Sequence, residues 1–281
     1  MRAENDKDIY LVFDYMETDL HAVIRANILE DIHQQYIIYQ ILKSLKYMHT
    51  GQLIHRDLKP ANILLNSECL VKVADFGLAR SVKAQEEGSN AVLTDYVATR
   101  WYRAPEILLG STKYSKAVDM WSLGCILGEL LAKRPIFPGT STLNQIERVI
   151  ELTGKPNAED VASIKSTLAG TMLESLPSTR TKSFHATFPS ASEPAIDLLK
   201  KLLAFNPKKR LNVEQALRHP YVAQFHNDDE EPGCPRPIKI CIDDNHKFSI
   251  REYRERLYKE ISMKKKEIRR RQLVSRGYYR S

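Results

Sequence analysis

The chain of 281 residues is 43% hydrophobic and 27% charged, which allows one large buried core or two modest ones. Its four cysteines show neither C-x-x-C spacing nor a paired pattern, which argues against a disulfide scaffold and favours a cytoplasmic or nuclear setting. The net charge of +7 comes from residues 251–281, which hold 12 Lys or Arg against 4 Glu, so the rest of the chain is close to neutral.

The predicted elements of the first half begin with a strand. Residues 9–13 are an apolar, β-rich run behind a polar turn, which predicts a buried strand. Residues 19–26 predict a short helix and residues 31–50 a long amphipathic one. Residues 63–65 and 70–73 flank a polar turn and predict a hairpin.

The second half is predicted to be mostly helical. Residues 117–132 are apolar but carry Asp119 and Glu129, which indicates a buried core helix rather than a membrane span. The stretch 153–192 is rich in Ser, Thr and Pro, has few periodic signals, and predicts a partly ordered insert. Further helices are predicted over 141–152, 193–203 and 212–219.

Three short motifs carry the chemistry of the chain. Residues 55–62 read H-R-D-L-K-P-A-N, residues 75–77 read D-F-G, and residues 104–106 read A-P-E, in that order. They match the catalytic loop, the magnesium-binding motif and a further motif of protein kinases. Any one of these polar residues could be an ordinary surface or capping residue, but three ordered matches indicate a protein kinase.

The resemblance to protein kinases gives each residue a role. Phosphoryl transfer needs positioning and neutralisation of charge more than covalent help from the protein. Asp57 would orient the substrate hydroxyl and accept its proton, and Lys59 would lie against the transferring phosphate. Asn62 and Asp75 would hold Mg²⁺ beside ATP, and the predicted hairpin would bring these two residues side by side.

The order of elements resembles the mostly helical large lobe of a protein kinase, with residual hinge strands, in an α+β fold. Only 54 residues precede His55, and they contain neither a G-x-G-x-x-G loop nor a V-A-I-K-like lysine. The resemblance therefore implies that most of the small lobe is missing and that this chain alone is inactive. Asp119 matches the buried aspartate that holds the catalytic loop, although a helix-capping carboxylate is the alternative. Arg210 matches the arginine that pairs with Glu106.

Residues 94–96, T-D-Y, and the seven residues that follow resemble the activation segment of mitogen-activated protein (MAP) kinases, closest to the atypical extracellular-signal-regulated branch. By this resemblance Thr94 and Tyr96 are phosphorylated, by an upstream kinase or by autophosphorylation. A phosphate adds negative charge and oxygens that arginine binds in a bidentate way. The phosphate-receiving residues would be Arg56, Arg80, Arg100 and Arg103.

The same resemblance implies further contacts. Thr99 would bridge Asp57 and Lys59 by hydrogen bonds, and the segment after it would select proline next to the phosphorylated Ser or Thr, because proline has no N–H to leave unsatisfied. Met and Leu at nucleotide-contact positions are more often core residues, so these assignments depend on the family alignment. The expected ATP contacts are Asp14, Met16, Asp19 and Leu64.

The C-terminal part combines an acidic run with a basic helix. The run resembles the docking site of MAP kinases for basic motifs of partners, and a solvated acidic loop is the alternative. A capping box at Ser249 and Glu252 starts an apolar stripe at helical spacing. The Lys and Arg clusters that follow favour a solvated helix end over nucleic-acid binding. The docking residues would be Asp228, Asp229, Glu230 and Glu231.

These observations predict a kinase domain over residues 1–225 and a docking loop with a basic amphipathic helix over 226–281. The predicted function is that of a proline-directed MAP kinase, which uses ATP and Mg²⁺ to phosphorylate Ser or Thr in protein substrates during intracellular signalling. The alternative is a non-catalytic kinase-like module that binds partners. The intact motif residues favour the kinase.

Overall fold

The computed structural model describes residues 8, 10–82, 99–111, 115–178, 180–240 and 246–275 and divides the chain into two compact units. The body is Met1–Ile240, and the second unit is Cys241–Ser281. The body extends past the boundary predicted at residue 225, because the chain returns to the end of a long helix. There the Ile238 N–H donates to the Gly51 carbonyl at 2.7 Å, and the Cys234 N–H donates to Thr50 Oγ1 at 2.8 Å.

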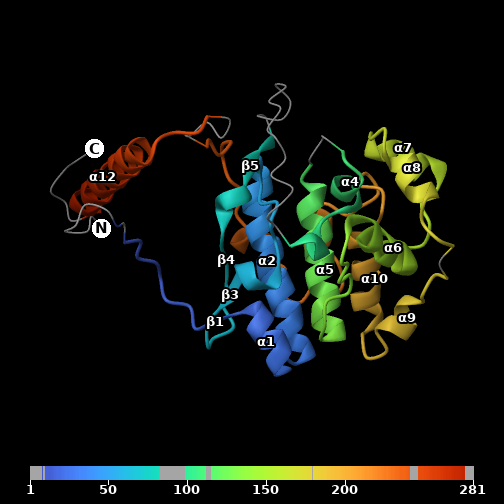
Figure 1. Ribbon diagram of the computed structural model, residues 1–281. Helices are drawn as coiled ribbons and strands as arrows, with labels where there is room; N and C mark the ends of the chain where they lie inside the picture. The colour runs from blue at the N-terminus through green and yellow to red at the C-terminus, as the bar shows by residue number, and fades with distance from the viewer. Residues whose placement is uncertain are drawn as a thin grey trace. The chain divides into compact units, whose positions relative to one another are not determined.

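Helices are the main elements of the described body (Figure 1). Its described α-helices are α1 (Leu20–Ala26), α2 (Asp31–Thr50), α4 (Pro105–Leu108), α5 (Ala117–Ala132), α6 (Thr142–Thr153), α7 (Ala158–Ile164), α8 (Ala169–Glu174), α9 (Phe184–Thr187), α10 (Glu193–Leu202) and α11 (Val213–Leu217). Short 3₁₀ helices are η1 (Pro60–Asn62), η2 (Phe76–Leu78), η3 (Arg100–Tyr102) and η4 (Asp228–Glu230).

The centre of the body is α2 packed against α5, with α10 on the other side of α5 (Figure 1). The buried face of α2 repeats at helical spacing, as its sequence predicts, and α5 is buried along almost its whole length. Gly124 lets α10 approach closely, because a Cβ there would lie 2.8 Å from Leu203 Cδ2. The largest fully buried side chains in this core include Trp121, Phe137 and Phe188.

Two small antiparallel sheets lie on the α2 side of the body. One has the order β1-β3-β4, with β1 at Thr18–Asp19, β3 at Ile63–Leu65 and β4 at Val71–Val73. The other pairs β2 (Leu53–Ile54) with β5 (Arg80–Ser81). The β3–β4 pair confirms the predicted hairpin. It places the motif residues that precede β3 beside those that follow β4.

One sequence prediction about the body is wrong, and another is refined. Residues 10–13 form no strand, and Leu11, Val12 and Phe13 are 59, 77 and 80% exposed. A strand needs a hydrogen-bonded neighbour, and none of the described strands pairs with this segment. The stretch 153–192, predicted as a partly ordered insert, contains three short helices, α7, α8 and α9, joined by irregular segments. These helices have seven residues or fewer, too short for periodicity to reveal.

In the second unit, α12 spans Ile250–Ser275 and confirms the predicted tail helix. Its capping box forms as expected, because the Ser249 N–H donates to Glu252 Oε2 at 2.8 Å and the Glu252 N–H donates to Ser249 Oγ at 3.3 Å. Most of its described side chains are exposed, so the helix is a polar element with a narrow half-buried stripe.

Candidate active site

The motif residues of the catalytic loop converge on the carboxylate of Asp57. Lys59 Nζ donates to Asp57 Oδ2 at 2.8 Å, and Asn62 Nδ2 donates to the same oxygen at 3.1 Å and to the Asp57 carbonyl at 2.8 Å. The other oxygen, Asp57 Oδ1, bonds to none of the described residues, and the side chain is 10% exposed. Asp57 therefore has one oxygen fixed by two donors and one that can accept a proton from a substrate.

The loop is held from one side by His55. Its Nε2 lies 3.0 Å from the Ala74 carbonyl, which only accepts hydrogen bonds, so Nε2 carries the proton and Nδ1 accepts the Asp57 N–H at 3.3 Å. The imidazole also meets the Phe76 ring edge-on, with centroids 5.0 Å apart. His55 thus joins the catalytic loop to the D-F-G segment.

From the opposite side the loop is held by Asp119 at the start of α5. Its carboxylate accepts the His55 N–H and the Arg56 N–H, each at 2.9 Å, and lies 2.9 Å from His49 Nε2. Burial alone would raise the pKa of this fully buried carboxyl, but the His49 contact and the two N–H donors lower it below its ordinary value. This geometry confirms the predicted tie between Asp119 and the loop. The sequence reasoning missed His49, which the motifs do not mark.

The predicted magnesium ligands are brought together by the hairpin. The Ala74 N–H donates to the Asn62 carbonyl at 2.8 Å, so Asp75 follows directly after a residue bonded to Asn62. Asn62 uses its Nδ2 on Asp57, which leaves its amide oxygen without a partner among the described residues. Asp75 is exposed and keeps one carboxylate oxygen beyond the one that accepts the Gly77 N–H. Amide and carboxylate oxygens suit Mg²⁺, so these residues fit the metal.

Two of the predicted nucleotide contacts lie in one row across the three-stranded sheet. Asp19 is opposite Leu64 in the β1–β3 register, and Leu64 is opposite Lys72 in the β3–β4 register. Lys72 in turn forms an ion pair with Asp14. The carboxylate of Asp19 also caps α1 by accepting the Ala22 N–H at 2.9 Å. Met16 is half-buried just before β1. Binding of ATP at these four residues stays a prediction.

The two predicted phosphorylation sites, Thr94 and Tyr96, lie outside the described residues. Of the four arginines expected to receive their phosphates, Arg80 is opposite Ile54 in the β2–β5 pair, just before the loop that contains Arg56. Arg100 belongs to η3, and Arg103 follows it. The roles of these arginines stay predictions.

Thr99 immediately precedes η3, where it is exposed and bonds to neither Asp57 nor Lys59. Asp57 and Lys59 instead contact each other directly, so the expected bridge through Thr99 is absent from this structure. The bridging role of Thr99 stays a prediction.

The segment after Thr99 is anchored by residues that the sequence reasoning missed. Gln145, fully buried in α6, donates through Nε2 to the Trp101 carbonyl at 3.3 Å and accepts the Gly139 N–H at 3.0 Å. The Tyr102 hydroxyl donates to Glu129 Oε2 at 2.6 Å. Burial raises the pKa of the Glu129 carboxyl, while the Tyr102 hydrogen bond opposes that shift. A polar residue in an amphipathic helix gives no signal that it will turn inward, which is why Gln145 was missed.

The Glu106–Arg210 pair forms as predicted. Arg210 donates through both terminal nitrogens to the two carboxylate oxygens of Glu106, at 2.9 and 3.1 Å. Both side chains are almost fully buried, and the guanidinium lies 5.1 Å from the centre of the Trp121 ring. This pair fixes α4 to the loop between α10 and α11.

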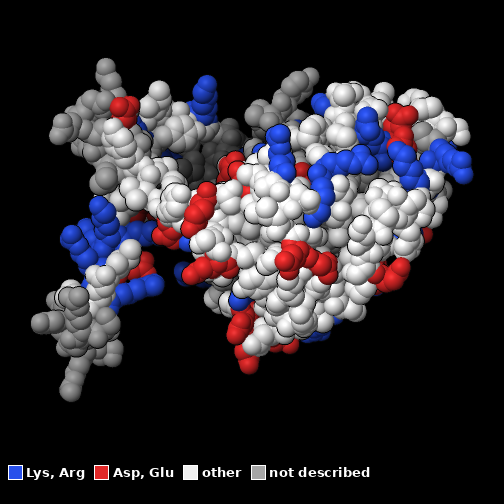
Figure 2. Space-filling model, turned by 90° about the horizontal axis from the view of Figure 1, so that it is seen from below, with Lys and Arg blue, Asp and Glu red and all other residues white. Residues whose placement is uncertain are grey.

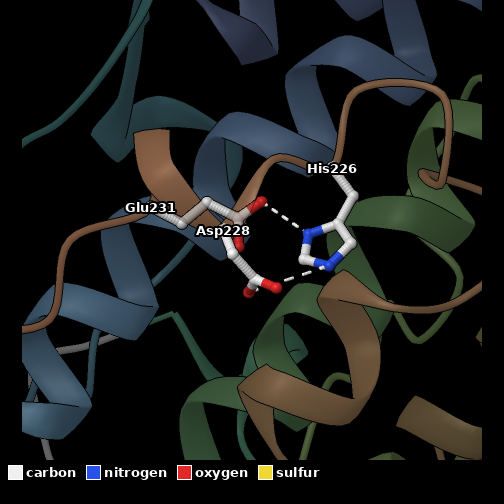
Figure 3. Close-up of side chains that lie close together, drawn as sticks. All are labelled: His226, Asp228 and Glu231. Carbon is white, nitrogen blue, oxygen red and sulfur yellow. Dashed lines mark hydrogen bonds and ion pairs between the residues drawn. The ribbon is translucent and has the colours of Figure 1, made fainter.

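Two of the predicted docking residues enclose a histidine (Figure 3). His226 Nδ1 lies 2.8 Å from Glu231 Oε1, and His226 Nε2 lies 3.9 Å from Asp228 Oδ1. The ligand atoms of this trio lie within 4.8 Å of one another, as a metal site requires. However, the carboxylates approach opposite nitrogens of one ring, and the Lys46 ammonium lies 3.4 Å from Glu231 Oε2 and 3.9 Å from Asp228 Oδ1. We interpret the trio as an ion network centred on Lys46.

The surface of the described body mixes both signs of charge. Figure 2 shows red and blue side chains interspersed with white ones on one face of the body. Asp229 and Glu230 of the acidic run are exposed, whereas the side chain of Glu231 is fully buried.

Within the described residues, no helix combines the length and the apolar character that crossing a bilayer requires.

Comparisons with known proteins agree with the motifs. The protein kinase domain family matches residues 2–222. "Extracellular signal-regulated kinase 2" of Dictyostelium discoideum is 66% identical over 97% of this chain and 74% of that protein. "Mitogen-activated protein kinase 15" of Xenopus laevis is 55% identical over 96% of this chain, and that of Caenorhabditis elegans is 50% identical over 96%, but the chain spans only 47% and 58% of those proteins. Since the family match starts at residue 2, it does not confirm that most of the small lobe is missing.

Proposed function

The chain belongs to the protein kinase family, among the serine/threonine kinases of MAP kinase type, whose members use ATP and Mg²⁺, and we propose that it phosphorylates Ser or Thr followed by proline in protein substrates. The observation that carries this proposal is the arrangement around Asp57. One of its oxygens is fixed by Lys59 and Asn62, and the other is available to a substrate hydroxyl. The MAP kinase relatives support the substrate class.

Each residue of the loop has a distinct part in the transfer. Asp57 orients the substrate hydroxyl and accepts its proton as the hydroxyl oxygen bonds to the γ-phosphorus and ADP leaves. Lys59 holds Asp57 in place and adds positive charge beside the transferring phosphate. Bound Mg²⁺, held by oxygens of Asn62 and Asp75, would neutralise phosphate charge. Asp119 fixes the loop backbone, so the carboxylate of Asp57 does not have to reorganise.

Regulation and partners follow from the same family assignment. Phosphates on Thr94 and Tyr96, added by an upstream kinase or by autophosphorylation, would order the segment around the receiving arginines. The exposed carboxylates of the acidic run would bind basic motifs of protein partners. Such a protein would act in cytoplasmic or nuclear signalling.

A phosphate-transfer assay tests the proposed reaction. The chain alone is expected to transfer little phosphate, so the assay uses it joined to the small lobe of a MAP kinase relative. With radiolabelled ATP and Mg²⁺, the joined protein should label a Ser-Pro peptide faster than the matched Ser-Ala peptide. Asp57→Asn should lower kcat by about 100- to 10,000-fold, whereas Glu255→Gln, in an exposed ion pair with Arg251 on α12, should leave it within about twofold. Labelling that survives Asp57→Asn would contradict the role of Asp57. A joined protein without activity that still binds a basic peptide would favour the non-catalytic module.

A further inference from the structure

A cavity of about 670 Å³ lies behind the catalytic loop, where the end of α2, the start of α5 and the start of α11 meet. This volume falls in the range of small-molecule sites. Its walls combine apolar side chains, such as Met120 and Val213, with cations and one carboxylate. It lies among elements other than those that bear the predicted nucleotide and docking residues.

The charges around the cavity are not balanced. Lys116 and Lys208 line it, and neither forms an ion pair with any described residue. Glu214 is the one acidic side chain among the lining residues. Arg210 also lines the cavity, but Glu106 neutralises its charge. The lining therefore keeps one positive charge in excess, which favours an anion.

Lys116 is the cation best placed to meet a ligand. It is half-buried at the start of α5, and burial lowers the pKa of its ammonium below the ordinary value, an effect that Glu214 partly offsets. A half-buried ammonium that has no carboxylate within ion-pair distance among the described residues is stabilised when an anion enters beside it. Met120 and Val213 would contact the apolar part of such a molecule.

His49 connects the cavity to the catalytic loop. It is 3% exposed, lines the cavity, and uses Nε2 on Asp119, while its Nδ1 bonds to none of the described residues. Asp119 in turn holds the N–H groups of His55 and Arg56. A ligand that contacts His49 is thus separated from the catalytic loop by a single carboxylate.

We propose that this cavity is a regulatory site for a small molecule with an apolar body and one anionic group, and that its occupancy is transmitted through His49 and Asp119 to the catalytic loop. Neither the nucleotide contacts nor the docking loop takes part. The proposal does not depend on the phosphate transfer proposed above, because binding can be measured without turnover.

The test uses 2-naphthoate and its uncharged isostere 2-naphthamide as probes, titrated into the whole chain and followed by ¹H–¹⁵N NMR. The naphthoate should bind with a dissociation constant of about 1 mM or tighter, and the amide should bind about tenfold more weakly. The His49 imidazole signals and the amide signals of His55 and Arg56 should shift with the same midpoint.

Matched variants complete the test. Lys116→Gln should weaken naphthoate binding by about tenfold, whereas Lys155→Gln, an exposed lysine outside the cavity, should leave it unchanged. Equal binding of the acid and the amide, or equal binding by the two variants, would overturn the anion site. Binding that shifts His49 but neither loop amide would overturn its connection to the loop.

Discussion

The buried Glu106–Arg210 pair allows a quantitative prediction. Arg210→Met removes a guanidinium that donates to both Glu106 oxygens and to the carbonyls of Ala117, Ala204 and Phe205. The Glu106 carboxylate would remain almost fully buried without its counter-charge. Breaking such a pair costs about 3–5 kcal/mol of unfolding free energy, which corresponds to about 6–20 °C in Tm for a body of this size.

Urea unfolding, followed by tryptophan fluorescence, measures this loss, because Trp121 lies against the Arg210 guanidinium. Arg218→Met is the matched control, since Arg218 is exposed and forms no ion pair with the described residues. It should change the unfolding free energy by less than about 0.5 kcal/mol.

A double variant separates the pair from the general cost of a core substitution. In Glu106→Leu with Arg210→Met, no charge is left buried, so the combined loss should be smaller than the sum of the two single losses. Additive losses would refute the reasoning, and so would an Arg210→Met variant as stable as Arg218→Met. The carbonyls released by Arg210 keep some loss in every variant.

Three further predictions concern other parts of the body. Burial raises the pKa of the Glu129 carboxyl, so the folded protein loses stability as the pH rises above the ordinary pKa of a glutamate. Glu129→Gln removes this loss and should raise Tm at about pH 8. The gain in Tm should shrink toward about pH 4. Gln145→Leu should lower the unfolding free energy in urea by about 1–3 kcal/mol, because it removes the donor to the Trp101 carbonyl and leaves the Gly139 N–H with only the Phe137 carbonyl. The exposed side chains of Val12 and Phe13 should promote self-association, so Val12→Asp should shift the sedimentation of the protein toward that of a monomer. If the protein without this substitution already sediments as a monomer, the prediction is wrong.

The long elements of the fold could be predicted because each carries its signal within itself. The ranges predicted for α2 and α5 coincide with the observed ones, since both helices have many turns and α2 also ends at Gly51. Helices α7 to α9 carry too few turns for such a pattern. The strand prediction at residues 10–13 was wrong for a different reason. The apolar character of these residues is local, but a strand depends on neighbouring strands that the segment itself does not specify.

The site divides in a similar way. Asp57, Lys59 and Asn62 lie within one short motif, so their proximity follows from the sequence, and the hairpin supplies Asp75. His49 could not be found, because its partner Asp119 is distant in the sequence and nothing marks a histidine at a helix end as buried. Contacts of this kind arise from packing between elements.

The catalytic loop is shaped by the body before any ligand arrives. Arg56 has a left-handed backbone with φ of 69°, a conformation that costs a non-glycine residue about 1–2 kcal/mol. The hydrogen bond from its N–H to Asp119 offsets that cost, and the neighbouring His55 N–H reaches the other oxygen of the same carboxylate. Because Asp119 is fixed in α5, the position of Asp57 depends on the core of the large lobe. Weakening the Asp119 contacts should therefore disturb the geometry at Asp57 even where the nucleotide-binding residues are intact.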